Sequence, residues 1–220
     1  MTTAADAPTP QPSLRDRQRA AVRADLRRAA YGLFTEHGYD SVSVDDIAAA
    51  AGLSRRTLFR HVATKEDLLL GPVRSGGAAI ARLLEQQPQR HNADRALVNA
   101  IIARAAAFED SESLGWRDAI LSAPDLLGKV TMLSPDDRDR IVAIVAARMG
   151  TDETTDARPG LLVQLTFAAG DYGFQQWIRQ PKAHSKPLTA WVEQSLQPVL
   201  HRQWRASTSS HPERSHDDQP

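Results

Sequence analysis

Residues 42–61 read VSVDDIAAAAGLSRRTLFRH, a stretch that predicts two short helices separated by a glycine turn. Ser43 and Ser54 are each placed to cap a helix, because a hydroxyl there accepts a hydrogen bond from an otherwise unpaired N–H. Gly52 can adopt the positive φ of a C-terminal cap, so the first helix is expected to end there. Two helices joined by so short a turn cross steeply, which is the geometry of a helix-turn-helix DNA reader.

The neighbouring residues support these helix starts. Asp46 stands three residues after Ser43, and Asp67 stands three residues after Thr64, the spacing of a reciprocal capping box. Aspartates in the first turn also favour the positive end of a helix. We therefore expect a third helix to begin at Lys65.

The helix that begins at Arg55 is predicted to be the recognition helix. Leu58 and Val62 are four residues apart and form its inward face. The side chains left to project into the major groove are Arg55, Arg56, Thr57, Phe59, Arg60 and His61. An arginine there can discriminate guanine by about 1–3 kcal/mol per bidentate pair. The alternative is a solvated basic face without a partner, and the caps and the glycine turn in register favour the DNA reader.

The chain from Arg17 to Leu70 resembles the N-terminal domain of TetR-family transcriptional regulators. The resemblance rests on Leu33-Phe34-x-x-x-Gly38-Tyr39, Ser43-Val44-x-x-Ile47-Ala48-x-x-Ala51-Gly52-Leu53-Ser54, Thr57-Leu58-Phe59-Arg60-His61-Val62 and Lys65-Glu66-x-Leu68-Leu69. It implies that DNA phosphates are held by Thr57, His61 and Lys65. It implies base contacts from Arg55, Arg56, Thr57, Phe59 and Arg60.

Phe59 stands where that family usually carries tyrosine, and it lacks the hydroxyl that would bind a phosphate. The full set of predicted DNA-binding residues is Ser43, Arg55, Arg56, Thr57, Phe59, Arg60, His61 and Lys65. The start of the first helix is a second candidate for phosphate contacts, because it carries Arg15, Arg17, Arg19, Arg23, Arg27 and Arg28. Phosphate contacts add affinity without sequence preference.

Composition bounds the class of protein. The chain has 220 residues, 41% of them hydrophobic, which is enough for one sizeable core or two modest ones. The formal net charge is zero, which argues against a protein that coats nucleic acid indiscriminately. Cysteine is absent, so disulfides, thiolate catalysis and cysteine-ligated zinc are excluded. No apolar run is long enough to span a bilayer, and we expect a soluble cytoplasmic protein with no membrane partner.

The sequence predicts an all-α chain. No long stretch alternates with period two, and helices are expected near 14–37, 44–51, 55–61, 65–87 with a break, 93–110, 114–132, 135–149, 157–180 and 188–204. Residues 14–63 are assigned to a helix-turn-helix DNA-binding domain, and residues 64–205 to a helical effector-binding and dimerisation domain. Residues 1–13 and 206–220 are Pro-rich or Ser-rich and are expected to be disordered tails.

The segment of Gly71-Pro72 followed by Gly76-Gly77 lies inside the helix that the resemblance makes the connection between the two domains. Proline lacks a backbone donor and clashes with the preceding turn, so the segment is expected to kink or split there. Two interpretations stay open. The break is either a functional hinge or a poorly formed helix.

The segment Trp116-Arg117-x-x-Ile120-Leu121-x-x-Pro124, with the helix order that follows it, resembles the C-terminal domain of regulators related to the mycofactocin-system repressor. That subgroup is associated with acyl-CoA-like ligands. The candidate effector contacts are Phe108, Trp116, Arg117, Ile120, Leu121, Phe167 and Phe174. Arg104 and Arg117 could bind a ligand anion if they point inward. The alternative is that the apolar residues are ordinary core and the arginines lie at the surface.

The last two long helices carry a broad apolar surface with small residues at positions of close approach. Two copies packed as a four-helix bundle would cover it, which predicts a homodimer. The residues concerned are Leu161, Leu162, Leu165, Ala168, Ala169, Tyr172, Leu188, Trp191, Val192, Ser195, Leu196 and Val199.

Two other classes of function compete with a ligand-responsive repressor that binds a palindromic double-stranded DNA operator. An enzyme is disfavoured, because the seven histidines form no H-x-x-x-H pair and neither a phosphate-binding glycine loop nor a G-x-S-x-G elbow is present. We therefore expect no catalytic residues, no metal site and no cofactor. A constitutive DNA-binding protein without an effector remains the alternative.

Overall fold

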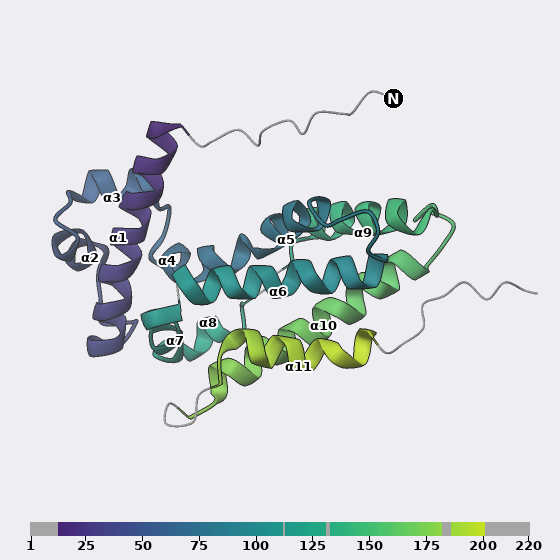
Figure 1. The fold of residues 1–220 in the computed structure, drawn as a ribbon. Coiled ribbons are helices and arrows are strands. Elements are labelled where there is room, and N and C mark those ends of the chain that lie inside the picture. The colour runs from purple at the N-terminus through teal and green to yellow at the C-terminus, as the bar shows by residue number, and fades with distance from the viewer. Residues whose placement is uncertain (1–12, 112, 131–132, 182–185, 201–220) are drawn as a thin grey trace, which may run out of the picture.

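The computed structural model describes residues 13–111, 113–130, 133–181 and 186–200, and these residues form eleven α-helices and no strand. A small N-terminal unit stands at one end of a longer helical body (Figure 1). We call this unit the reader; it comprises α1 (Leu14–His37), α2 (Val44–Ala50) and α3 (Arg55–His61). The all-α fold predicted from the sequence is confirmed.

Local capping explains where the reader helices begin. The Ser43 hydroxyl accepts from the Asp46 N–H at 3.2 Å, and an Asp46 carboxylate oxygen accepts from the Ser43 N–H at 2.8 Å, so the predicted capping box is present. Gly52 has a φ of +67°, as the turn requires. Ser13, at the end of the predicted tail, is the N-cap of α1. Residues 1–12 and 206–220 lie outside the described part of the chain.

The apolar faces of the reader helices meet in one small core. Leu26, Phe34, Ile47 and Leu58 come from three different helices and are completely buried. The expected inward face of α3 is confirmed, because Val62 is also buried.

The connecting helix breaks within the predicted segment, three residues after Pro72. Pro72 lies inside α4 (Lys65–Arg74), and the chain leaves helical geometry at Ser75 before α5 (Gly76–Glu85) begins. The break expected in this segment is therefore present, and it lies beside Gly76 rather than at Pro72. Proline leaves the carbonyl of Leu68 without its helical donor, but the Tyr31 hydroxyl donates to that oxygen at 3.2 Å. The Ser75 hydroxyl donates to the Pro72 carbonyl at 2.9 Å.

The larger body, which we call the effector unit, is built on a layered set of long helices (Figure 1). Its helices after α5 are α6 (Ala93–Ser111), α7 (Ser113–Leu121), α8 (Pro124–Leu127), α9 (Pro135–Met149), α10 (Arg158–Arg179) and α11 (Leu188–Leu200). The α10 helix packs against α6, α9 and α11. A Cβ at Gly173 would lie 2.8 Å from the Trp191 carbonyl oxygen, so glycine permits the close approach of α10 and α11.

The predicted helix over 114–132 differs from the structure. The expected helix over 114–132 is split into α7 and α8, because Pro124 cannot continue a helix and instead occupies the first turn of a new one. Residues 131 and 132 lie outside the described residues, as do 201–204 at the end of the last predicted helix. Within the described segments, no helix combines the length and the apolar character that crossing a membrane requires.

Candidate nucleic-acid interface and apolar cavity

The α3 helix presents basic and aromatic side chains to solvent. Arg55, Arg56, Phe59 and Arg60 are exposed, while Thr57 is half-buried. Arg55 Nη1 donates to Asp45 Oδ2 at 2.8 Å, and its guanidinium carbon lies 5.5 Å from the centroid of the Phe59 ring. Arg56 makes no ion pair with the described residues, so it is the less encumbered of the two arginines that open the recognition helix.

Lys65 fixes the geometry of the reader. Its Nζ donates to the carbonyls of Tyr39 at 2.8 Å and Val42 at 2.9 Å, and it lies 4.1 Å from the centroid of the Tyr39 ring. The first residue of α4 thereby holds the turn between α1 and α2. Sequence reasoning missed this contact, because the partners are backbone carbonyls more than twenty residues away and leave no motif.

The two hydroxyl residues in the predicted DNA-binding set lie at helix N-termini. Ser43 Oγ donates to Asp46 Oδ2 at 2.6 Å, and Thr57 Oγ1 lies 2.9 Å from Ser54 Oγ. A hydroxyl has one hydrogen to donate, so Ser43 can bond to a phosphate oxygen only after its bond to Asp46 is broken. These positions place both hydroxyls at the N-termini of α2 and α3.

A basic hollow joins α1 to α3. It has a volume of about 550 Å³ and is lined by Arg15, Gln18, Arg19, Val22, Arg23, Arg60 and His61. Burial, together with the positive charges of Arg60, Arg23 and Arg19, lowers the pKa of His61. The structure thus brings Arg15, Arg19 and Arg23 of the first helix beside Arg60 and His61 at the end of α3.

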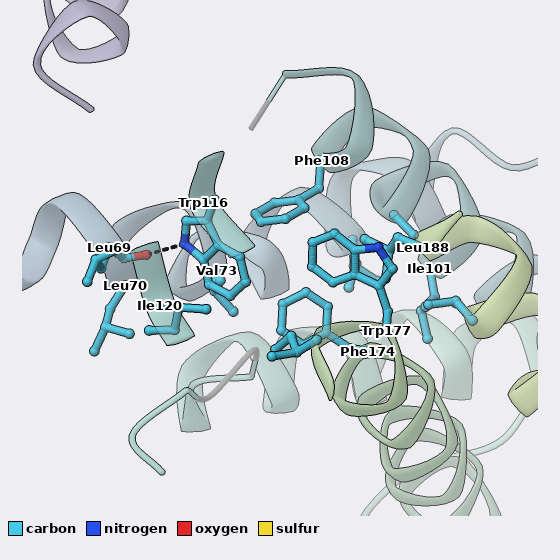
Figure 2. Close-up of a cluster of buried hydrophobic side chains, with 14 of the residues drawn as sticks. Leu69, Leu70, Val73, Ile101, Phe108, Trp116, Ile120, Phe174, Trp177 and Leu188 are labelled. Atoms are coloured by element: carbon cyan, nitrogen blue, oxygen red, sulfur yellow. Dashed lines mark hydrogen bonds between the residues drawn. The ribbon is translucent and has the colours of Figure 1, made fainter. Parts of the chain in front are cut away.

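The α4 helix is bonded to three other helices around Pro72. Trp116 Nε1 on α7 donates to the Leu69 carbonyl at 2.7 Å, the dashed bond in Figure 2. Arg104 on α6 donates through Nη2 to the Pro72 carbonyl at 2.7 Å. With the bond from Tyr31 of α1 to the Leu68 carbonyl, the backbone of α4 is held from both the reader and the effector unit.

Four aromatic rings gather beside this connection (Figure 2). The ring centroid of Phe108 lies 5.3 Å from that of Trp116, and the rings of Trp116 and Trp177 stack at 6.2 Å. Phe174 packs against Phe108 and Trp116 at 5.9 and 5.6 Å. Phe108 and Phe174 of this aromatic cluster also line a cavity in the effector unit.

The cavity has a volume of about 40 Å³ and is almost entirely apolar. Three of the predicted effector contacts line it, namely Phe108, Phe167 and Phe174. Trp116 is not among the lining residues, but its ring packs against those of Phe108 and Phe174. Among the described residues, Arg104 is the single charged residue in its wall. The remaining lining residues, which the sequence did not assign to an effector site, are Val73, Gly76, Ile80, Ile101, Ala105, Gly170, Leu188 and Val192.

Three predicted effector contacts lie away from the cavity. Arg117 donates through Nε to the Ile178 carbonyl at 3.1 Å and through Nη2 to the Gln180 carbonyl, so it ties α7 to the end of α10. Ile120 is completely buried in the core, and Leu121 is 45% exposed.

The predicted dimer surface divides into two parts. Leu162, Leu188, Val192, Leu196 and Val199 are buried within this one chain. A stripe along α10 stays exposed, with Leu161 at 52%, Leu165 at 37% and Tyr172 at 59%, and Ala168 lies between them. We call these four residues the α10 stripe.

A helix-turn-helix unit with an exposed basic helix, joined to a helical body that holds an apolar cavity, defines a DNA-binding transcription regulator. Residues 26–71 match the family described as bacterial regulatory proteins, tetR family, and residues 92–201 match the MftR C-terminal domain. The chain belongs to the TetR family of bacterial regulatory proteins and carries an MftR-like C-terminal domain.

Two relatives share most of their length with this chain. It is 32% identical over 205 residues to the transcriptional regulator TcmR of Streptomyces glaucescens, covering 88% of this chain and 91% of TcmR. It is 32% identical over 173 residues to a candidate mycofactocin biosynthesis transcriptional regulator, MftR of Mycobacterium tuberculosis, covering 77% of this chain and 86% of MftR.

Solved structures share the fold at lower identity. NalD, a secondary repressor of an efflux pump in Pseudomonas aeruginosa, superposes with a TM-score of 0.55 at 19% identity, covering 84% of this chain and 100% of NalD. FadR of Bacillus halodurans superposes with a TM-score of 0.56 at 19% identity, covering 84% and 97%.

Proposed function

We propose that this protein is a ligand-responsive repressor that binds a near-palindromic operator as a homodimer and releases it when a small hydrophobic or acyl-CoA-like effector binds. The observation that carries the proposal is the connection at α4. Its backbone is bonded by Tyr31 of the reader and by Trp116, whose ring packs on rings that line the apolar cavity. A ligand that moves those rings acts on the helix from which the reader extends.

The α10 stripe supports the dimer. Its residues lie at positions 161, 165, 168 and 172, a spacing that keeps them on one side of a helix. Exposed apolar side chains in such a row are a surface for a second copy, and a twofold dimer matches the symmetry of a palindromic operator.

The cavity supports an apolar effector and sets a condition on its binding. A single water occupies roughly 10–15 Å³ on the measure used for such cavities, so a volume of about 40 Å³ admits only a few water-sized groups. An acyl chain suits the lining chemically but requires the surrounding side chains to move apart. A ligand that binds only the expanded form of the cavity shifts the protein from the compact form toward the expanded one.

Gly71 and Pro72 are proposed to set how readily α4 responds. A Cβ at Gly71 meets nothing within 4 Å, so Gly71→Ala with Pro72→Ala is tolerated sterically and restores a backbone donor opposite the Leu68 carbonyl. That donor competes with the Tyr31 hydroxyl. The double variant is expected to keep operator binding and to change the ligand concentration needed for release, whereas a response like that of the wild type assigns Pro72 no part in signalling.

The experiment that tests the proposed function has two parts. Native mass spectrometry of the purified protein shows whether an apolar molecule copurifies. A titration with a long-chain acyl-CoA then follows tryptophan emission and operator release together, since Trp116 and Trp177 both belong to the aromatic cluster. Emission should change over the concentrations that release the operator.

A cavity-filling variant supplies the matched control. Gly170 lines the cavity, and its Cβ would lie 3.5 Å from Ile101 Cγ2, so Gly170→Leu fills the space. Gly160→Ala lies on the same helix, where an added Cβ meets nothing within 4 Å. Only Gly170→Leu should lose the response. The small cavity also favours a second candidate, a constitutive DNA-binding protein, which is supported instead if no ligand releases the operator.

A further inference from the structure

The cleft between the reader and the effector unit has no assigned role. It has a volume of about 750 Å³ and is lined by residues of α1, α3, α4, α5 and α6. That volume falls within the roughly 300–1,000 Å³ typical of small-molecule sites. We infer that this cleft binds a small organic anion of nucleotide size with two or more negative charges, which bridges the two units.

Cations face one another across the cleft. Arg23 and Arg27 line it from α1, and Arg82 and Arg104 line it from α5 and α6. Arg23 and Arg82 are exposed and take part in no ion pair with the residues that the structure describes. Guanidinium groups on opposite walls suit an anion whose charged groups can be gripped from two sides.

Of the residues that the structure describes, only Asp67 brings a carboxylate to the same cleft. Asp67 lies 3.2 Å from Arg74 Nη1, so its charge is already paired outside the row of cleft arginines. The positive potential reaches His61, because Arg23 contributes to lowering the pKa of that imidazole. The cleft therefore attracts anions rather than cations.

The floor of the cleft suits the uncharged part of such a ligand. It is formed by one face of α4 and by small or apolar side chains, namely Leu68, Gly71, Pro72, Ala79, Leu83 and Ala107. A Cβ at Gly71 would meet nothing within 4 Å, so a planar ring can approach the backbone there. A purely inorganic anion would leave this apolar surface unused.

The inference deepens the proposed function, and it depends on that function only for its effect on the operator. Arg23 and His61 line both this cleft and the basic hollow proposed for DNA phosphates. An anion in the cleft and the DNA backbone thus compete for the Arg23 guanidinium. Arg104 lines both the cleft and the apolar cavity, so the anion could be a free nucleotide or the head group of an acyl-CoA.

Calorimetric titration of the full chain with ADP tests the inference, with adenosine as the uncharged comparison. ADP is expected to bind once per protomer, and adenosine is not expected to bind measurably. Arg82→Gln should weaken ADP binding by about tenfold to a hundredfold, the range for a lost charge-assisted hydrogen bond. Arg95→Gln, an exposed arginine on α6 outside the cleft, should leave it unchanged.

The operator provides a second readout that a merely basic surface would not give. Operator DNA should weaken ADP binding, and ADP should weaken operator binding by the same factor, because coupling between two sites is reciprocal. The inference is overturned if ADP does not bind, if Arg82→Gln and Arg95→Gln bind it equally, or if the operator leaves its affinity unchanged.

The Gly170→Leu variant distinguishes a free nucleotide from an acyl-CoA head group as the source of the anion. It also distinguishes the cleft site from the proposed function. If the anion is a free nucleotide, a long-chain acyl-CoA should bind no better than ADP to the wild type. If it is an acyl-CoA head group, the acyl-CoA should bind more tightly than ADP, and Gly170→Leu should remove that advantage while ADP binding persists. Operator release through a Gly170-sensitive cavity without any ADP binding overturns the cleft site and leaves the proposed function standing.

Discussion

The reader and the effector unit differ in how their structure is encoded. In the reader, the N-caps of α1, α2 and α3 bond to residues only three positions away. In the effector unit, the contacts that define the cavity and the α4 connection join residues 32 and 47 positions apart, as Arg104 and Trp116 show. Local chemistry thus specifies a DNA-reading surface, whereas a ligand site depends on tertiary packing that a sequence pattern does not display.

The largest expected effect comes from removing the centre of the long-range network. Trp116 is completely buried, packs against three other rings and bonds to the Leu69 carbonyl. Trp116→Ala should lower the free energy of unfolding by about 3–5 kcal/mol, the range for an aromatic side chain deleted from a core. Equilibrium urea unfolding measures it. A loss below about 1 kcal/mol would contradict the central place given to this cluster.

Trp116→Phe sharpens the same point, because it retains a ring but removes the indole N–H that bonds to the Leu69 carbonyl. If that hydrogen bond couples the effector unit to α4, operator release should need a different ligand concentration although the protein stays folded. Unchanged release would limit Trp116 to a packing role.

The next effect concerns the surface of the reader. Arg56→Ala should weaken binding to the cognate operator by about 1–3 kcal/mol and leave binding to random DNA almost unchanged, because base contacts carry specificity. Arg55→Ala should behave similarly, although it also frees Asp45 from its ion pair. Anisotropy titrations on both DNAs give the comparison. Equal losses of affinity for operator and for random DNA would show that these arginines do not contact bases.

A smaller effect tests whether the reader depends on local caps. Ser43→Ala should destabilise the protein by about 1 kcal/mol, the usual loss of an N-cap. Hydrogen bonds from the Ser43 hydroxyl and N–H lower the pKa of Asp46. The folded pKa is depressed, so this stabilisation is present at neutral pH and is lost as the pH falls through that value. The pH dependence of thermal unfolding should flatten in Ser43→Ala, and an unaltered profile would contradict the role of the capping box.

The smallest effect is a pH dependence of DNA binding. Burial and the charges of Arg60, Arg23 and Arg19 lower the pKa of His61 in the free protein. A nearby phosphate raises that pKa, so binding takes up a proton and operator affinity should increase as the pH falls, by at most about tenfold per unit for one proton. His61→Gln should reduce this dependence. If operator affinity changes with pH equally in the wild type and in His61→Gln, His61 does not contact the DNA.

Residues with strong local signals allowed the fold to be predicted closely. The ends of α1, α3 and α9 agree with the sequence, since Ser54 and Ser134 are N-caps and Gly38 and Gly150 end helices with positive φ. The α4–α5 break lies in the predicted segment, but the hydrogen bond from Tyr31 to the Leu68 carbonyl that Pro72 leaves without its helical donor could not be predicted, because Tyr31 is far away in sequence.

The candidate sites follow the same division. The exposed face of α3 could be predicted from helical periodicity, but the hydrogen bonds from Lys65 to two backbone carbonyls could not. Aromatic side chains indicated a quarter of the cavity lining, at Phe108, Phe167 and Phe174. Apart from Arg104, the rest of the lining consists of aliphatic residues and glycines that look like any other core positions until the helices are packed.

The most direct test of the account is selection of binding sites for the full-length protein from random-sequence duplex DNA, followed by a footprint on the enriched sequence. The account predicts an inverted repeat with half-sites about one helical turn or slightly more apart, occupied by two chains, with enrichment lost in Arg56→Ala. Recovery of unrelated sequences without an inverted repeat, or equal enrichment by the Arg56→Ala variant, would contradict it.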